Sequence, residues 1–467
     1  MCENLNAEIA GGTVSSLADA VGYLNWTFYA RRMRSNPSYY GASSGSDEDV
    51  DFALLSVVEK TTAKLSSSGC IYYDAKADAG QLVPTPLGVA SCSYYLSYET
   101  PRQMQFGVRE GRKMIQNELG QETDDAQLET RLFQRGKRVD EISLAWLMYT
   151  LCNTHEFDEL PVRHNEELLN EELSTAVSWG ADTQKLLTGN EGYHSQDIFA
   201  DPHTKAFLLI QAYLEKVRLP ISDYVNDTKS VVENVPRLLA AMEYIASSDM
   251  TAGGSFELIT QFARTRQCFE TRSLPSDNPL LQIGLTESVV RSLTGGAKGK
   301  HDTFPEISKL RSLHRKDALV LLNKVNHGKG GIGLFDSVMD RLYSIPAVKL
   351  QKANVTNQVE KATGKSLGKL KLLLEVERTR GKNASRSSEM SLTIIVGSNK
   401  QRTLLSKASI RLSRWGKWEL KKELDFDWNA ANADGGEGGG SVLVRLLINE
   451  VRGFDQEVRV PLRYNEI

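Results

Sequence analysis

The spacing of apolar residues over the first hundred positions predicts two helices, a small hairpin and a third helix. One helix is expected over 17–34 and ends before Pro37, because the residue preceding a proline disfavours the helical conformation. A second helix is expected from about Asp47, and two short strands follow within 71–83. Thr85 supplies a capping hydroxyl directly before a proline, so a further helix begins there. This order of elements is typical of a winged helix.

Residues from about 101 to 250 follow a mostly helical pattern. Breaks are expected at Gly120, Gly136, Pro161 and Gly180. One helix is expected over 203–218, and the most regular amphipathic helix over 227–246. The apolar stripe of that last helix consists of Val231, Val232, Val235, Leu238, Leu239, Met242, Ile245 and Ala246. Its other face carries Ser230, Glu233, Asn234, Arg237 and Tyr244.

The pattern changes after Pro346, where helical spacing gives way to short β-type runs separated by turns. Before that point, residues 255–343 remain helical but less regular, with segments at 307–325 and 334–342. The β-type runs are 371–377, 390–396, 404–412, 418–420, 442–448 and 457–462. Regular short strands of this kind are typical of a sandwich. The predicted fold class is therefore multidomain and mainly α, followed by a C-terminal all-β sandwich.

Composition limits the possible partners of the chain. It has 467 residues, enough for several domains, and 56 Lys and Arg against 59 Asp and Glu give a net charge of -3. No overall field therefore attracts nucleic acid, and any such contact must come from a local basic or aromatic patch. No apolar run is long enough to span a membrane, and no secretory signal opens the sequence.

The five cysteines are scattered and form no CxxC pair, so neither a zinc site nor a disulfide framework is expected. This use of cysteine is typical of a reducing compartment, the nucleus or the cytoplasm. The cysteines are Cys2, Cys70, Cys92, Cys152 and Cys268.

Two glycine-rich segments partly match nucleotide-binding motifs. Residues 328–333 fit G-x-G-x-x-G, but they follow a helical segment instead of a strand, so a polar loop is the better interpretation. Gly364-Lys365-Ser366 resembles the end of a Walker A loop, but Val359 stands where its leading glycine belongs. No ATP site is therefore expected in the chain, and no residue is assigned a catalytic role.

Two histidines lie close to carboxylates in sequence. His155 is near Glu156 and Asp158, and His164 is near Glu166 and Glu167. A metal or acid–base site is conceivable at either position. Polar packing at helix ends is the favoured interpretation, because no i, i+4 histidine pair with an intervening acid occurs.

Six segments, in order along the chain, carry a family resemblance. They are 25–41, 86–96, 160–167, 201–212, 219–231 and 455–457. Together they resemble the Sec63 unit of large Ski2-like RNA helicases, most closely the C-terminal cassette of the activating-signal-cointegrator complex helicase and next the U5 snRNP helicase. The resemblance implies four domains. These are a winged helix over 1–98, a helical ratchet bundle over 99–252, a helix-loop-helix domain over 253–345 and an immunoglobulin-like or C2-like β-sandwich over 346–467.

In this family, a long helix of the bundle contacts the translocating single strand, which the resemblance places at 227–246. Arg237 can bind a phosphate or stack on a base, and Tyr244 offers a stacking face. Pro236 should kink the helix. The alternative is an ordinary solvated helix face. The other candidate residues on this helix are Lys229, Ser230 and Asn234.

The winged helix of such helicases braces the motor domains. Arg31, Arg32 and Arg34 can contact RNA or an acidic motor surface, and a solvated helix end is the alternative. Lys316 and the basic loop 298–300 are weaker nucleic-acid candidates. The sandwich is expected to dock protein partners. Its tryptophans, Trp415, Trp418 and Trp428, are interpreted as core residues.

The predicted function is that of an accessory C-terminal unit of an ATP-dependent helicase. It would guide single-stranded RNA or DNA and dock the motor domains and other proteins. No cofactor is expected in this chain, because ATP and Mg²⁺ would bind to the motor domains. The alternative is a stand-alone protein-docking scaffold in an RNA-processing or ribosome-quality-control complex.

Overall fold

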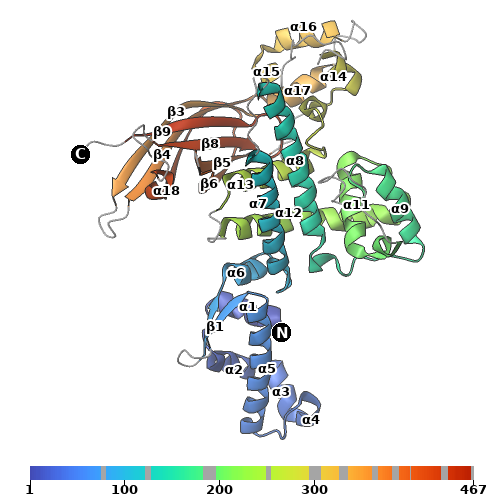
Figure 1. Ribbon diagram of the computed structural model, residues 1–467, viewed down its shortest axis with the longest axis vertical. Coiled ribbons are helices and arrows are strands. Elements are labelled where there is room, and N and C mark those ends of the chain that lie inside the picture. The colour runs from blue at the N-terminus through green and yellow to red at the C-terminus, as the bar shows by residue number, and fades with distance from the viewer. Residues whose placement is uncertain are drawn as a thin grey trace. The chain divides into compact units, whose positions relative to one another are not determined.

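The computed structural model describes residues 1–74, 80–120, 128–181, 196–248, 254–293, 307–325, 335–359, 366–380, 389–399, 401–432 and 440–463. The chain divides into two compact units (Figure 1). The first comprises Met1–Gln121, Ala145–Tyr213 and Val217–Met250, and the second Glu122–Leu144, Leu214–Lys216 and Thr251–Ile467. Within the described ranges, no helix has the length and apolar character needed to cross a membrane. The four domain boundaries expected from the sequence stay predictions.

The first unit begins with a winged helix. Its elements are α1 (Cys2–Ala10), α2 (Leu17–Asn25), α3 (Phe28–Ser35), α4 (Pro37–Tyr40), α5 (Asp47–Ser67), β1 (Ile71–Asp74), β2 (Gln81–Pro84) and α6 (Pro86–Ser93). Strands β1 and β2 form an antiparallel hairpin, and the Thr85 side chain caps α6 as expected. The Ser46 side chain caps α5. The single helix predicted over 17–34 is wrong. It divides because Thr27 is extended and its hydroxyl donates to the Leu24 carbonyl over 2.6 Å.

Helix α6 packs very closely on the turn between α5 and β1. A Cβ atom placed on Gly88 would lie 2.1 Å from the carbonyl oxygen of Cys70. The Asn6 side chain donates to the Gly88 carbonyl over 2.9 Å. Only glycine therefore allows this approach, which joins α6 to both α1 and the hairpin.

The helical bundle completes the first unit. Its elements are α7 (Thr100–Gly120), α8 (Leu128–Cys152, of which the part from Ala145 belongs to this unit), η1 (His155–Phe157), α9 (Glu166–Ala176), η2 (Gln196–Ala200), α11 (Pro202–Glu215) and α12 (Asp223–Ser248). The break predicted at Gly136 is wrong, because α8 continues through it. Helix α11 ends three residues earlier than predicted, where Lys216 adopts a left-handed φ of +59°. Helix α12 begins at Asp223, four residues before the predicted start.

The described residues of the second unit form the part of α8 up to Leu144, six further helical segments and then seven strands. The helical segments are α13 (Phe256–Thr271), η4 (Pro279–Ile283), α14 (Glu287–Leu293), α15 (Ile307–Ser312), α16 (Arg315–Val325) and α17 (Asp336–Ser344). The strands are β3 (Ala347–Val359), β4 (Ser366–Arg378), β5 (Ser391–Ser398), β6 (Leu404–Arg411), β7 (Gly416–Asp427), β8 (Ser441–Ile448) and β9 (Gln456–Arg463), with α18 (Trp428–Asn432) after β7.

The strands are hydrogen-bonded in the order β6-β5-β8-β9-β3-β4-β7. Strands β3 and β9 run parallel and pair at Val355–Leu462 and Thr356–Arg463. The outermost strands, β6 and β7, approach each other, so the sheet curls almost into a barrel. The β-rich C-terminal region is thus confirmed, whereas a two-sheet immunoglobulin-like sandwich is not.

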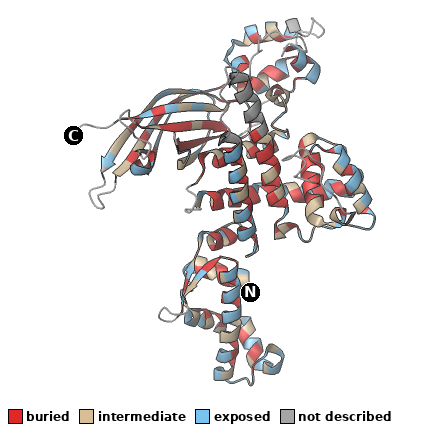
Figure 2. Cartoon of the chain, viewed as in Figure 1, coloured by how far each residue is buried: buried red, intermediate tan, exposed pale blue. Residues whose placement is uncertain are grey.

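Buried positions continue along β5 and β8 on both faces (Figure 2). Helix α13 covers one face of β5, and a Cβ atom on Gly397 would lie 2.4 Å from the Phe256 ring. Trp428 is buried in this core, as predicted. Trp415 and Trp418 are only partly buried, and the guanidinium of the buried Arg378 lies 4.1 Å from the Trp415 ring.

Candidate functional site

Helix α12 has one face committed to the core and one face open, as its sequence pattern indicates. Seven of the eight apolar stripe positions are buried, and Val232 alone among them is partly exposed. Pro236 lies inside the helix on the exposed side, and the helix continues through it. Because proline has no N–H, its exposed position leaves the freed carbonyl group within reach of water. Helix α12 can therefore remain continuous at Pro236.

Arg237 is the central residue of this open face. Its Nη1 donates to the backbone oxygens of Tyr94 and Tyr95 over 3.0 and 2.6 Å. Its Nη2 donates to Oδ1 of Asn234 over 2.8 Å. The last carbonyls of a helix lack intrahelical donors and carry partial negative charge, so a guanidinium stabilises them. Arg237 therefore binds the C-terminal end of α6 and fixes the Tyr94–Tyr95 segment against α12.

The other predicted residues of α12 fall into two groups. Asn234 lies beside Arg237, and the Tyr244 ring lies 6.1 Å from the Tyr94 ring at 54°. Lys229 and Ser230 are exposed nearer the start of the helix, where the Lys229 ammonium lies 3.8 Å from the Glu233 carboxylate. The structure thus brings together Arg237, Asn234 and Tyr244, and it adds two tyrosines to which the sequence gave no role.

The remaining predicted residues lie elsewhere. Arg31 and Arg32 are exposed on α3, and the Arg31 guanidinium lies 6.0 Å from the Phe28 ring. Lys316 is exposed in the first turn of α16, in the second unit. The basic loop 298–300 and the glycine-rich segment 328–333 lie outside the described residues, as do Gly364 and Lys365. None of these residues belongs to the cluster around Arg237.

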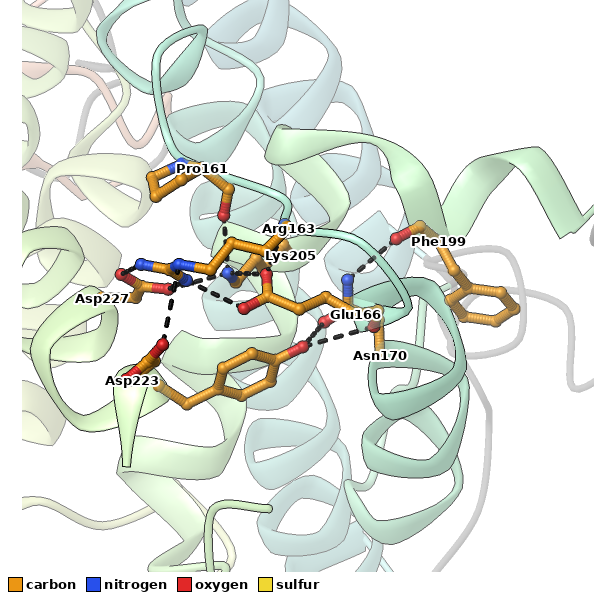
Figure 3. Close-up of polar contacts among 9 residues, drawn as sticks. Pro161, Arg163, Glu166, Asn170, Phe199, Lys205, Asp223 and Asp227 are labelled. Atoms are coloured by element: carbon orange, nitrogen blue, oxygen red, sulfur yellow. Dashed lines mark hydrogen bonds and ion pairs between the residues drawn. The ribbon is translucent and has the colours of Figure 1, made fainter. Parts of the chain in front are cut away.

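A buried charge network fixes the first turns of α12 (Figure 3). Lys205, on α11, is fully buried, and its Nζ donates to Glu166, Asp227 and the Pro161 carbonyl over 2.5, 2.7 and 2.6 Å. Arg163 donates to the Glu166 and Asp227 carboxylates, each over 2.8 Å. Two cations thus balance two buried carboxylates.

Both carboxylates of the network stay ionised. Desolvation is the largest single influence and raises the pKa of Glu166 and of Asp227. The hydrogen bonds from Lys205 and Arg163 together outweigh it, so each pKa lies below its ordinary value. The network therefore joins the 160–167 segment and α11 to α12 by charge-assisted hydrogen bonds.

Sequence reasoning missed this network, although its residues lie in three of the segments that carry the family resemblance. Charged residues in helical sequences are mostly exposed, and no spacing rule brings together partners that are 22 to 64 residues apart. The sequence pattern therefore assigns no role to Arg163 or Lys205.

The cluster around His155 forms polar packing at helix ends, as predicted, whereas His164 is exposed and Glu166 belongs to the charge network. Glu156 accepts hydrogen bonds from the Ser97 N–H and the Thr100 hydroxyl at the start of α7. Asp158 contacts His155 over 2.9 Å and His203 over 3.1 Å. Across the part of the chain that the structure describes, no group of three or more such side chains is arranged to hold a metal ion.

Comparison with known proteins agrees with this arrangement. Residues 130–460 match the Sec63 Brl domain, and residues 1–75 match the winged helix-turn-helix domain of the SNRNP200 type. Because the first match covers more than half of the sequence, the chain belongs to the Sec63 Brl domain family. This confirms the resemblance to the Sec63 unit of Ski2-like helicases.

Three helicases illustrate the relationship. DExH-box ATP-dependent RNA helicase DExH14 of Arabidopsis thaliana is 33% identical over 62% of this chain and 12% of its own length. Activating signal cointegrator 1 complex subunit 3 of Homo sapiens is 34% identical over 53% of this chain and 9% of its own length. RQC trigger complex helicase SLH1 of Saccharomyces cerevisiae is 30% identical over 73% of this chain and 15% of its own length. The chain thus spans only a small part of each relative.

Proposed function

We propose that this chain is the accessory unit of an ATP-dependent helicase, in which it guides single-stranded RNA or DNA and docks the motor domains. One observation carries the proposal. Beside the open face of α12, the Arg237 guanidinium holds the carbonyls of Tyr94 and Tyr95, and the Tyr94 ring lies 6.1 Å from the Tyr244 ring. ATP and Mg²⁺ chemistry is assigned to the motor domains.

The chemistry of this cluster suits a single strand. Aromatic rings stack on bases of any sequence, and a cation attracts the phosphate backbone. Since the net charge of the chain is -3, a local cluster of this kind has to supply the attraction. Helix α12 can present the cluster rigidly, because its other face is packed and its first turns are held by the charge network.

We expect the chain to bind a fluorescein-labelled oligouridylate of about 12 nucleotides with an affinity that falls as salt rises. Arg237→Ala should weaken binding about tenfold, whether the guanidinium contacts the strand or positions its neighbours. Fluorescence anisotropy at low and moderate salt measures both effects. Arg411→Ala, at an exposed position of β6 in the second unit, is the matched loss of one positive charge and should leave binding unchanged. Equal binding by wild type and Arg237→Ala would remove α12 from the interface.

Docking onto motor domains is supported by an aromatic patch on the winged helix, defined by Trp26, Phe28 and Phe52. All three side chains are exposed, Trp26 by 89%. The Asn25 amide donates to the Asp51 carboxylate over 2.6 Å, which places the end of α2 beside the first turns of α5. Large apolar side chains gathered in solvent mark an interaction surface, and Arg31 and Arg32 follow on the same helix as Phe28.

The double variant Trp26→Ser/Phe52→Ser should lose affinity for a separately produced helicase motor cassette by about tenfold or more, since buried aromatics dominate protein interfaces. Biolayer interferometry with the immobilised 467-residue chain measures the loss. Tyr72→Ser removes an exposed aromatic from β1 and is the control. Unchanged affinity in the double variant argues against the patch. Motor binding without any RNA binding supports the alternative function, a protein-docking scaffold.

A further inference from the structure

Tyr95 combines an unusual backbone conformation with a solvent-exposed ring. Its φ is +52°, in the left-handed region that non-glycine residues rarely adopt, and the residue is 85% exposed. Such a conformation is unfavourable for a non-glycine residue and persists only where the surroundings impose it. Because the ring is exposed, its burial does not offset this unfavourable conformation. The stability of the fold therefore does not explain why a tyrosine stands at this position.

The surroundings do impose the conformation. The Leu96 N–H donates to the Ser91 carbonyl over 2.9 Å, and the Ser91 hydroxyl donates to the Leu96 carbonyl over 3.0 Å. Leu96 itself is buried. On the N-terminal side, Arg237 holds the Tyr94 carbonyl over 3.0 Å, and it also holds the Tyr95 carbonyl over 2.6 Å. Tyr95 therefore projects from a segment that is fixed at both ends.

We propose that Tyr95 stacks on a base of the bound single strand and that Arg237 is a positioning residue which holds the Tyr95 backbone. The inference rests on the proposed function and assigns a residue outside α12 to the interface. Three of the five guanidinium N–H groups of Arg237 are used within the protein, two of them on the carbonyls of Tyr94 and Tyr95. The Tyr94 ring packs near Tyr244, whereas the Tyr95 ring remains in solvent.

Single-stranded nucleic acid is the occupant that fits this arrangement best. A fixed, exposed ring loses little conformational entropy when a base stacks on it, and stacking does not depend on base identity. A protein partner would instead bury a larger apolar surface, and Tyr95 is a single exposed ring beside polar groups of α12.

The test compares oligouridylate with an abasic ribose-phosphate strand of the same length. Tyr95→Ala should weaken oligouridylate binding about tenfold, Tyr95→Phe should bind within about twofold of wild type, and the abasic strand should bind wild type and Tyr95→Ala equally. Tyr72→Ala is the matched control for an exposed aromatic in the same unit. Thermal unfolding of each variant reports the fold.

The salt dependence of binding distinguishes a phosphate contact of Arg237 from a positioning role. Loss of a phosphate contact lowers the slope of log affinity against log salt by about one, whereas loss of a positioning contact leaves that slope unchanged. We expect an unchanged slope for Arg237→Ala, and no further loss when Tyr95→Ala is added to it. If Tyr95→Ala binds oligouridylate as tightly as wild type does, this inference is overturned and the proposed function is not. The same holds if the substitution weakens binding of the abasic strand as much as binding of oligouridylate. Absence of wild-type binding overturns the proposed function with it.

Discussion

We expect Lys205→Met to lower the free energy of unfolding of the first unit by about 3–5 kcal/mol. Methionine fills most of the space of the lysine side chain, so the loss is chiefly electrostatic. It leaves Glu166 and Asp227 buried with Arg163 as their remaining cationic partner. Urea denaturation, with hydrogen exchange at the amides of α11 and α12 to identify the unit that unfolds, measures the change.

Lys229→Met is the matched control, because Lys229 is exposed on α12 and its ion pair with Glu233 is in solvent. Its effect should stay within about 0.5 kcal/mol. A Lys205→Met variant as stable as this control would show that the network does not hold α12.

The same network sets a dependence on pH. Because the pKa values of Glu166 and Asp227 are lowered in the folded state, their contribution is complete above the ordinary carboxyl pKa of about 4. It is lost as the pH falls through the lowered values. The stability difference between wild type and Lys205→Met should therefore be largest near neutral pH and shrink in acid. A difference that is constant down to acid pH would contradict the assignment.

Gly88→Ala should destabilise the winged helix by about 3 kcal/mol, the upper range for overpacking. The added Cβ atom would lie 2.1 Å from the Cys70 carbonyl oxygen, which belongs to the backbone and cannot rotate away. Relief requires α6 to move from the hairpin, with loss of the hydrogen bond from Asn6. Thermal unfolding followed by circular dichroism measures the shift.

Gly22→Ala is the control for this substitution. Gly22 lies within α2, and nothing lies within 4 Å of an added Cβ atom. Alanine should therefore stabilise the helix there by up to about 1 kcal/mol. If Gly88→Ala and Gly22→Ala changed the thermal stability equally, the close packing of α6 would make no contribution to stability.

Local signals in the sequence predicted most elements of the fold. The capping hydroxyl of Thr85 predicted the start of α6, and the apolar stripe of α12 predicted its buried face. Strand β3 was missed, because polar residues such as Lys349, Lys352 and Asn354 interrupt its apolar positions. Its pairing with β4 and β9 stabilises it, and such tertiary contacts override a weak local pattern.

The candidate site was predicted only in part. The open face of α12 followed from helical periodicity, which is a local property. The contact between Arg237 and Tyr94 joins residues 143 positions apart, so no periodicity could show it. The left-handed conformation of Tyr95 could not be predicted either, because it depends in part on the hydrogen bond from Arg237, which is distant in sequence. Sequence therefore located the helix, and the structure shows what Arg237 binds within the protein.

The buried charge network also constrains how the sequence can evolve. Its charges are supplied by Arg163, Glu166, Lys205 and Asp227, which lie on three separate segments. Loss of one member leaves a buried charge without its full set of partners, and a second substitution elsewhere is needed to restore balance. Descendants of this chain should therefore exchange these positions as a set, through an intermediate that is poorly folded. These four residues are expected to diverge together, while the exposed residues of α12 change one at a time.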